Sequence, residues 1–115
     1  MVENRTTPRL MVAWHSAFRL PSQRIVHAKI SNISVSGLQF LCGENLQLNQ
    51  KYQMQMYVPD INGGTSTTLV PCFFECMYVI LSGKDYRIGG KFSGFSPEHK
   101  TLITRWSEKS TRPAS

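Results

Sequence analysis

Residues 67–81 alternate apolar and other side chains with a period of two, and this pattern restricts the fold more than any other feature. The even-numbered positions from 70 to 80 are all apolar: Val70, Cys72, Phe74, Cys76, Tyr78 and Ile80. The odd-numbered positions include Pro71 and Glu75, which fit a face or an edge that meets solvent. Because successive side chains of a β-strand point to opposite sides, the pattern predicts one long strand with a buried face.

Five other segments predict shorter strands, and turn-forming residues separate them. Residues 52–58 alternate most clearly, with Met54 and Met56 on the apolar side. The remaining four predicted strands are 10–18, 24–30, 38–42 and 86–92. Residues 31–37 (SNISVSG) predict a polar turn, and 59–66 (PDINGGTS) predict a hairpin loop.

The period changes after residue 95. Ser96, Pro97 and Glu98 supply an N-cap, a proline for the first helical position and an acidic first turn. Apolar-side positions then follow at helical spacing: His99, Leu102, Ile103 and Trp106. We therefore predict a mainly β fold, a small six-stranded antiparallel β-barrel with a C-terminal α-helix over 97–109. We expect residues 10–109 to form this domain, 1–9 to be a flexible arm and 110–115 to be a tail.

The basic residues outnumber the acidic ones, 13 to 7, for a net charge of +6. The excess is concentrated near the N-terminus, which predicts that anions bind at that end. The longest apolar stretch is too short for a membrane span, and the N-terminus has no apolar leader. Three cysteines without a framework spacing fit a reducing compartment. These features predict a cytoplasmic protein without membrane insertion.

Two short motifs carry recognisable chemistry. Arg5 and Arg9 lie four residues apart (RTTPR), and Asn32, Ser34 and Gly37 stand in the sequence NISVSG. Taken alone, each is weak, because turn-forming asparagine and serine often bond their own backbone.

Together and in this order, the two motifs resemble the PilZ domain family, whose signature is an RxxxR arm followed by a [DN]xSxxG turn on a β-barrel. RIGGKF (87–92) looks like the last barrel strand of that family, and SPEHKTLITRW (96–106) like its closing helix. The resemblance covers residues 5–106. It implies a receptor for the bacterial second messenger cyclic di-GMP, with no enzymatic activity, no cofactor and no metal.

The resemblance also implies which residues bind the ligand. Arg5 and Arg9 should hold the phosphates and guanine, while Asn32, Ser34 and Gly37 line the opposite wall. The guanidinium fork suits this ligand, because it pairs with phosphate and with the O6/N7 edge of guanine and can stack on the base. Glycine permits a close approach or a positive φ. Ser36, Gly89 and Lys91 are weaker candidate contacts. Asn4 stands where many relatives have a further arginine, which favours a single bound ligand.

The function implied is to pass the cyclic di-GMP signal to an unidentified protein partner in trans, in control of motility, biofilm or polysaccharide. We expect binding to fold the arm over the barrel and so build a protein-binding surface. One alternative is a degenerate PilZ-like interaction module that binds no nucleotide. A second is a basic nucleic-acid-binding barrel that stacks bases on Trp14 and Phe18. The neutral middle of the chain disfavours nucleic acid.

Metal, redox and enzyme chemistry are not indicated. Cys72 and Cys76 lie about 13 Å apart on a strand, too far for a disulfide, and so are predicted to be buried thiols. The three histidines are scattered, no His/Cys pair has metal-ligand spacing, and no catalytic triad is visible.

Overall fold

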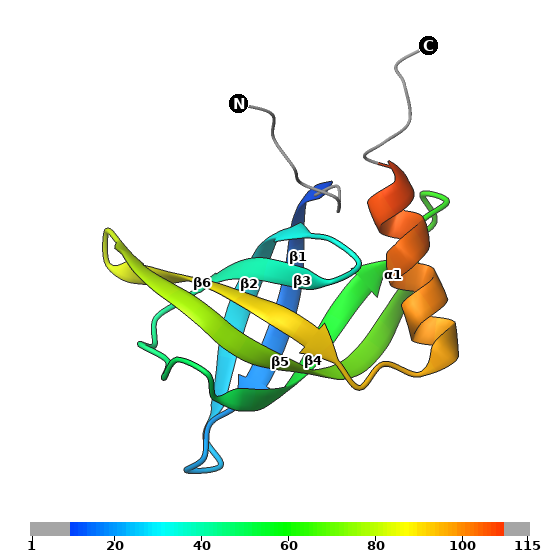
Figure 1. The fold of residues 1–115 in the computed structure, drawn as a ribbon. Helices are drawn as coiled ribbons and strands as arrows, with labels where there is room; N and C mark the ends of the chain where they lie inside the picture. The colour runs from blue at the N-terminus through cyan, green and yellow to red at the C-terminus, as the bar shows by residue number, and fades with distance from the viewer. Residues whose placement is uncertain (1–9, 110–115) are drawn as a thin grey trace, which may run out of the picture.

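A computed structural model describes residues 10–109, and these residues form six strands and one helix (Figure 1). In chain order they are β1 (Leu10–Arg19), β2 (Ile25–Ile33), β3 (Gly37–Cys42), β4 (Lys51–Pro59), β5 (Thr67–Ser82), β6 (Asp85–Ser93) and α1 (Pro97–Lys109). The predicted arm at 1–9 and tail at 110–115 lie outside the described residues. Each of the six predicted strands is present, and the predicted helix has the bounds expected.

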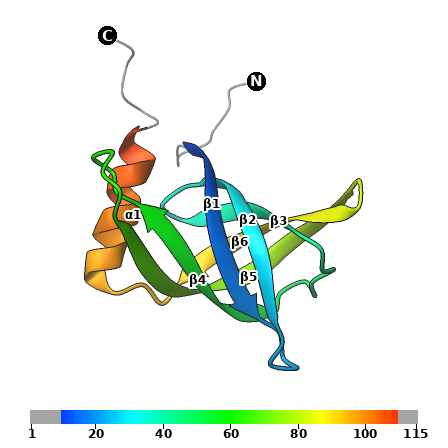
Figure 2. The ribbon, with the colours of Figure 1, turned by 180° about the vertical axis from the view of Figure 1, so that it is seen from behind.

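The six strands form a closed barrel in the order β1-β2-β3-β6-β5-β4. All neighbouring strands are antiparallel, and β4 returns to β1 through the pairs Ser16–Met56 and Phe18–Met54. Figures 1 and 2 show the strands wrapped around a common interior with α1 at one side. The predicted barrel with a C-terminal helix is therefore confirmed. Closure also leaves these short strands without open edges.

The interior is filled by the alternate side chains that the sequence pattern marks. Phe74 lies at the centre, with ring centroids 5.0 Å from Phe40, 5.2 Å from Tyr52 and 5.6 Å from Phe18. The Phe40 and Phe18 rings meet that of Phe74 nearly edge-on, a favoured geometry for aromatic pairs. The predicted core residue Met54 is buried with them.

The predicted alternation of β5 is wrong beyond Cys76. The register with β6 shifts between Cys76 and Tyr78, which inserts one extra residue on the β5 side. A one-residue shift exchanges the two faces of a strand. Val79 therefore packs against the core, whereas Ile80 on the predicted inner parity is 48% exposed.

The helix begins and packs as the sequence predicts. The backbone N–H of His99 donates to Ser96 Oγ at 3.2 Å, which is the expected N-cap. Ile103 is buried in the barrel core, and the Trp106 ring meets that of Trp14 edge-on at 5.2 Å. Lys109 Nζ also donates to the carbonyl of Ile61 in the β4–β5 loop at 3.2 Å. These contacts hold α1 against one end of the barrel.

The polar segment 31–37, which the sequence predicts to be a turn, is only partly a turn. Strand β2 continues to Ile33, so Asn32 is a strand residue opposite Met11 on β1 and Gln39 on β3. The register shifts on both sides of this stretch, between Met11 and Trp14 and between Ile30 and Asn32. The strand therefore tolerates polar side chains there, and the true turn is limited to residues 34–36.

Cys72 and Cys76 are buried free thiols, as predicted, and Cys42 is a buried free thiol as well. Burial raises the pKa of each thiol, because an apolar interior disfavours the thiolate, and it raises the pKa of Cys72 from 9.0 to about 12.

The raised pKa of Cys72 predicts a loss of stability at alkaline pH. The folded state holds this proton more tightly than the unfolded chain, so the stabilisation is complete below pH 9.0 and is lost as the pH rises toward about 12. Urea unfolding at pH 8, 9 and 10 should show the free energy of unfolding falling more steeply in the wild type than in Cys72→Ala. Equal slopes in the two proteins would contradict this assignment.

Candidate functional site

The turn between β2 and β3 fixes the predicted serine and glycine against each other. The Ser34 N–H donates to the Gly37 carbonyl at 2.9 Å, and the Gly37 N–H donates to Ser34 Oγ at 3.2 Å. Ser36 Oγ lies 3.4 Å from Ser34 Oγ, so the two hydroxyls form one polar group. The motif thus does bond its own backbone, and this bonding holds Ser34 in a single orientation.

Gly37 is required by a close approach of two strands. It pairs with Lys91 on β6, and a Cβ at Gly37 would overlap the carbonyl oxygen of Gly90. Its φ is not positive, so the close approach, and not backbone conformation, explains this glycine. The Phe92 N–H donates to the Ser36 carbonyl at 3.0 Å and ties the turn to β6.

A hollow of about 400 Å³ opens beside this turn on the outside of the barrel. Four predicted site residues line it: Ser34, Ser36, Gly37 and Lys91. The other lining residues are Leu38, Met77, Tyr78, Gly90 and Phe92. Lys91 is the only charged side chain in this set, and it gives the hollow a positive charge suited to an anion.

Met77 and Tyr78 also line the hollow, and the sequence did not predict them there. They reach the hollow because the register shift of β5 occurs at this point, opposite the glycines of β6. In the sequence, the pair Gly89-Gly90 could have indicated an irregularity in this part of the sheet, because glycines inside a strand often mark a bulge or a close approach. The sequence did not show that the irregularity lies on the facing strand.

Gly89 is explained by packing within the protein. A Cβ at this position would overlap the Tyr78 ring, which lies over the Gly89 backbone. Gly89 is not among the residues that line the hollow, whereas its neighbour Gly90 is.

Asn32 does not line the hollow, although it stands only two residues before the lining residue Ser34. It is buried, and its side-chain Nδ2 donates to Gln39 Oε1 at 2.7 Å. One strand away, Leu10 pairs with Ile33, so the chain enters the barrel beside the β2–β3 turn. Arg5 and Arg9 lie outside the described residues.

The structure contradicts the prediction that Trp14 and Phe18 stack on the bases of a single-stranded nucleic acid. Trp14 and Phe18, the two rings assigned to base stacking, are only 5% and 1% exposed. Both belong to the barrel core, so neither can stack on a base from solvent. Within residues 10–109 no group of His, Cys, Asp or Glu side chains is arranged to hold a metal ion.

Comparison with protein families identifies the class. The family model described as "PilZ domain" matches residues 3–109, nearly the whole chain and both motifs. The chain therefore belongs to the PilZ family, a family of non-catalytic cyclic di-GMP receptor domains. A comparison with curated proteins found no match.

Solved structures share the fold at low sequence identity. The Bacillus subtilis inhibitor of motility MotI/DgrA aligns with a TM-score of 0.80 at 10% identity, over 96% of this chain and 52% of that one. The PilZ domain of Escherichia coli YcgR with c-di-GMP gives 0.69 at 14% identity, over 95% and 92%. The K. pneumonia MrkH–c-di-GMP complex gives 0.74 at 14%, over 91% and 50%. The chain thus spans about half the length of MotI/DgrA and MrkH.

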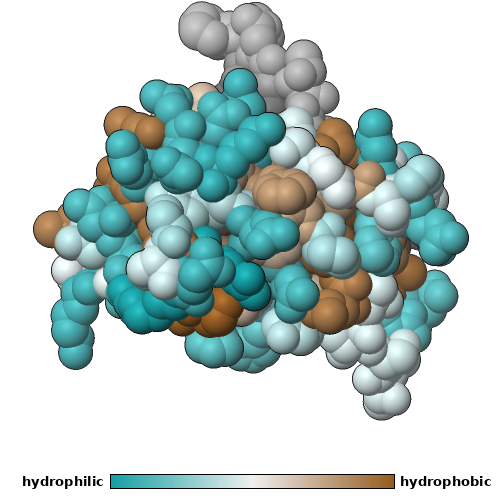
Figure 3. Space-filling view, turned by 90° about the horizontal axis from the view of Figure 1, so that it is seen from below, coloured by the Kyte–Doolittle hydropathy of each residue, from teal (hydrophilic) through white to brown (hydrophobic). Residues whose placement is uncertain are grey.

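Seen from below, hydrophilic side chains surround several separate hydrophobic patches (Figure 3). The described residues include no helix that is long and apolar enough to cross a membrane.

Proposed function

We propose that this domain is a cytoplasmic receptor that binds cyclic di-GMP in the hollow beside the β2–β3 turn. Arg5 and Arg9 would grip the phosphates and a guanine. Ser34 and Gly37 would form the facing wall, and Asn32, two residues before Ser34 on β2, would contact the ligand from beside the hollow. The family match supports this assignment, because it spans both motifs. Cyclic di-GMP also binds the PilZ domain of YcgR, which has the same fold.

The observation that carries the proposal is the convergence of Ser34, Ser36, Gly37 and Lys91 on one hollow. Lys91 is far in the sequence from the other three residues, and the β3–β6 pairing brings it beside Gly37. The serine hydroxyls offer short, oriented polar groups, and the lysine supplies a positive charge for a phosphate.

The position of β1 suits the proposed role of the arginines. Leu10 pairs with Ile33, the residue before Ser34. Peptide geometry keeps the Cα of Arg9 about 3.8 Å from that of Leu10, and each earlier residue adds at most about 3.6 Å of reach. Both arginines are therefore tethered within reach of the turn.

Thermal unfolding tests the binding claim. A ligand that binds only the native state stabilises it, by about 2.7 kcal/mol at a concentration 100 times the Kd. Cyclic di-GMP should raise the melting temperature in a saturable way, and GTP at equal concentration should not. An unchanged melting temperature would point to the degenerate interaction module.

We propose further that ligand binding draws residues 1–9 onto the barrel and so presents a new surface to a protein partner in trans. Charge attraction between the two arginines and the phosphates would drive the change. Amide hydrogen exchange of residues 2–9 should slow when cyclic di-GMP is added. Unchanged exchange in this segment, with binding confirmed, would reject the switch but not the receptor.

Gly37→Ala should lose ligand binding and about 1–3 kcal/mol of stability, because the added methyl group forces β3 away from the Gly90 carbonyl. Gly43→Ala is the matched control, since a Cβ there faces open space. Urea unfolding and a cyclic di-GMP titration of both variants measure the two effects. Normal stability and binding in Gly37→Ala would show that the turn tolerates a side chain.

A further inference from the structure

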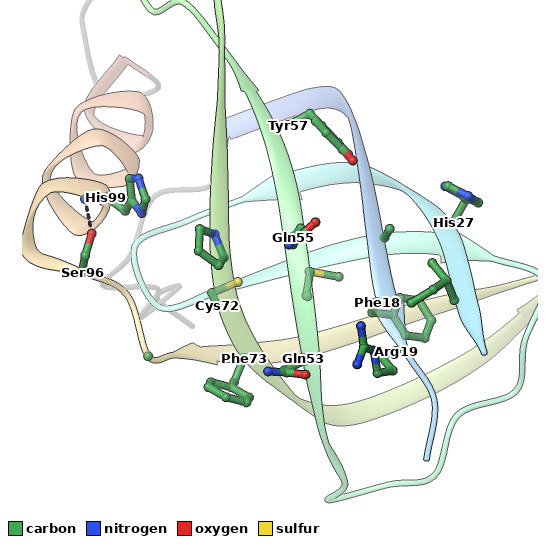
Figure 4. A pocket seen from close by; sticks show the side chains of 15 residues that line it. Phe18, Arg19, His27, Gln53, Gln55, Tyr57, Cys72, Phe73, Ser96 and His99 are labelled. Carbon is green, nitrogen blue, oxygen red and sulfur yellow. Dashed lines mark hydrogen bonds between the residues drawn. The ribbon is translucent and has the colours of Figure 1, made fainter. Parts of the chain in front are cut away.

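A second hollow, of about 610 Å³, lies on the outer face of β2, β1, β4 and β5. It shares no lining residue with the hollow beside the β2–β3 turn. Figure 4 shows it from close by, with Gln53, Gln55 and Tyr57 along β4, and Arg19 and His27 toward one side. Phe73 of β5 lies on the other side, and the start of α1 lies beyond it (Figure 4). This groove is therefore a separate feature of the barrel surface.

Short side chains on adjacent strands create the hollow. Ala17 on β1 pairs with His27 on one side and Gln55 on the other, and Gln55 pairs with Pro71. This row crosses all four strands, and its Ala17 and Pro71 side chains extend little above the sheet. A row with longer side chains lies beside it, through the pairs Arg19–Ile25 and Gln53–Phe73. Ala17 and Pro71 therefore leave low points in the surface, bordered by the longer side chains of this row and of the next.

The walls of this hollow carry exposed apolar side chains. Tyr57 and Phe73 are 41% and 40% exposed, and Ile25 is exposed as well. An antiparallel sheet usually presents polar side chains on its solvated face. Aromatic residues that stay partly exposed around a hollow are typical of a protein-binding surface.

The groove is positive and contains no acidic residue. Arg19 stands on its wall, with its Nη1 donating at 3.3 Å to the neutral Gln23 Oε1. By contrast, Arg24 is neutralised by Glu44 at 2.8 Å. On the same outer face, His15 pairs with Lys29 and extends the basic surface. No aspartate or glutamate lines the groove, so an occupant with negative charge is favoured.

We infer that this groove, formed by Ala17, Arg19, Ile25, Gln55, Tyr57 and Phe73, binds an acidic segment with apolar anchors from a partner protein. Charge disfavours a second copy and the residues that flank the barrel in this sequence as occupants. The residues before Leu10 hold two arginines against Glu3, and those after Lys109 hold Arg112 and no acid. A second copy brings the same net charge of +6. Four strands span about 14 Å, enough for a short extended or helical segment.

Selection of a random twelve-residue peptide library on the whole domain tests the inference. The selected peptides should combine Asp or Glu with Phe, Tyr, Leu or Ile, and should bind the wild type with or without cyclic di-GMP. Arg19→Glu should weaken the best peptide at least about tenfold, because charge reversal in the groove repels it. Arg87→Glu is the matched control, an exposed strand arginine that lines neither hollow, and should leave binding unchanged.

Tyr57→Ser tests the apolar wall separately and should also weaken the peptide, with circular dichroism used to check the fold. No enrichment of acidic peptides, or equal weakening by the two charge reversals, would overturn the inference. Tighter binding of a single-stranded oligonucleotide than of the best peptide would assign the face to nucleic acid instead. Since the peptide readout does not need cyclic di-GMP, its failure is distinguishable from failure of the receptor function.

Discussion

Replacing Arg9 with alanine should weaken cyclic di-GMP binding by about 100-fold or more. An arginine paired with a phosphate makes charge-assisted hydrogen bonds, and truncating one member of such a pair costs about 2–5 kcal/mol. The wall beside the β2–β3 turn supplies one charged side chain, Lys91, so it offers little compensation. Anisotropy of a fluorescent cyclic di-GMP analogue measures the change in Kd.

Two further variants make the Arg9 prediction specific. Arg87→Ala removes an equal charge from an exposed strand position away from the hollow, and should change the Kd less than about twofold. Arg9→Lys keeps the charge but loses the planar fork, and should give an intermediate affinity. Equal affinities of the wild type and Arg9→Ala for cyclic di-GMP would show that the RxxxR motif does not bind the ligand.

Replacing Phe74 with alanine should lower the free energy of unfolding by about 3–5 kcal/mol. The ring is fully buried and packs on Phe18, Phe40 and Tyr52, so its removal leaves a cavity that several strands border. A loss of this size is a large part of the roughly 5–15 kcal/mol by which a domain is stable. Chemical denaturation at pH 7 measures it through the midpoint and the slope.

Phe73→Ala is the matched control, because it makes the same chemical change one residue away on the outer face. Phe73 is 40% exposed, so its loss should cost no more than about a third as much. Comparable losses in the two variants would contradict the assignment of inner and outer faces on β5.

Periodicity was enough to predict most of the fold. Because Val70, Cys72, Phe74 and Cys76 alternate with polar or exposed residues, β5 and its inner face could be read directly. The capping sequence Ser96-Pro97-Glu98 likewise located the start of α1. The β3–β6 pairing was not predictable, since it joins segments far apart in the sequence and depends on closure of the whole barrel.

The errors occurred where the backbone departs from a regular strand. The bulge near Met77 reverses the faces of β5, and no residue of β5 itself signals it. Asn32 belongs to a strand because its backbone pairs with Met11 on β1 and with Gln39 on β3, and local turn propensity cannot predict these pairings.

The candidate site was partly predictable from the motif. Ser34, Ser36, Gly37 and Lys91 do converge, while Met77 and Tyr78 join them through the bulge. Trp14 and Phe18 show the opposite case, since they were considered for base stacking from residue type alone, and residue type does not show whether a ring faces solvent or the core.

Calorimetric titration of cyclic di-GMP into the purified domain tests the central claim most directly. We predict saturable heat with a stoichiometry near one, no heat with GTP, and loss of the signal in Arg9→Ala. Absence of heat from cyclic di-GMP at several temperatures, with a correctly folded protein, would contradict the receptor function. The barrel would then be a PilZ domain that acts only by binding another protein.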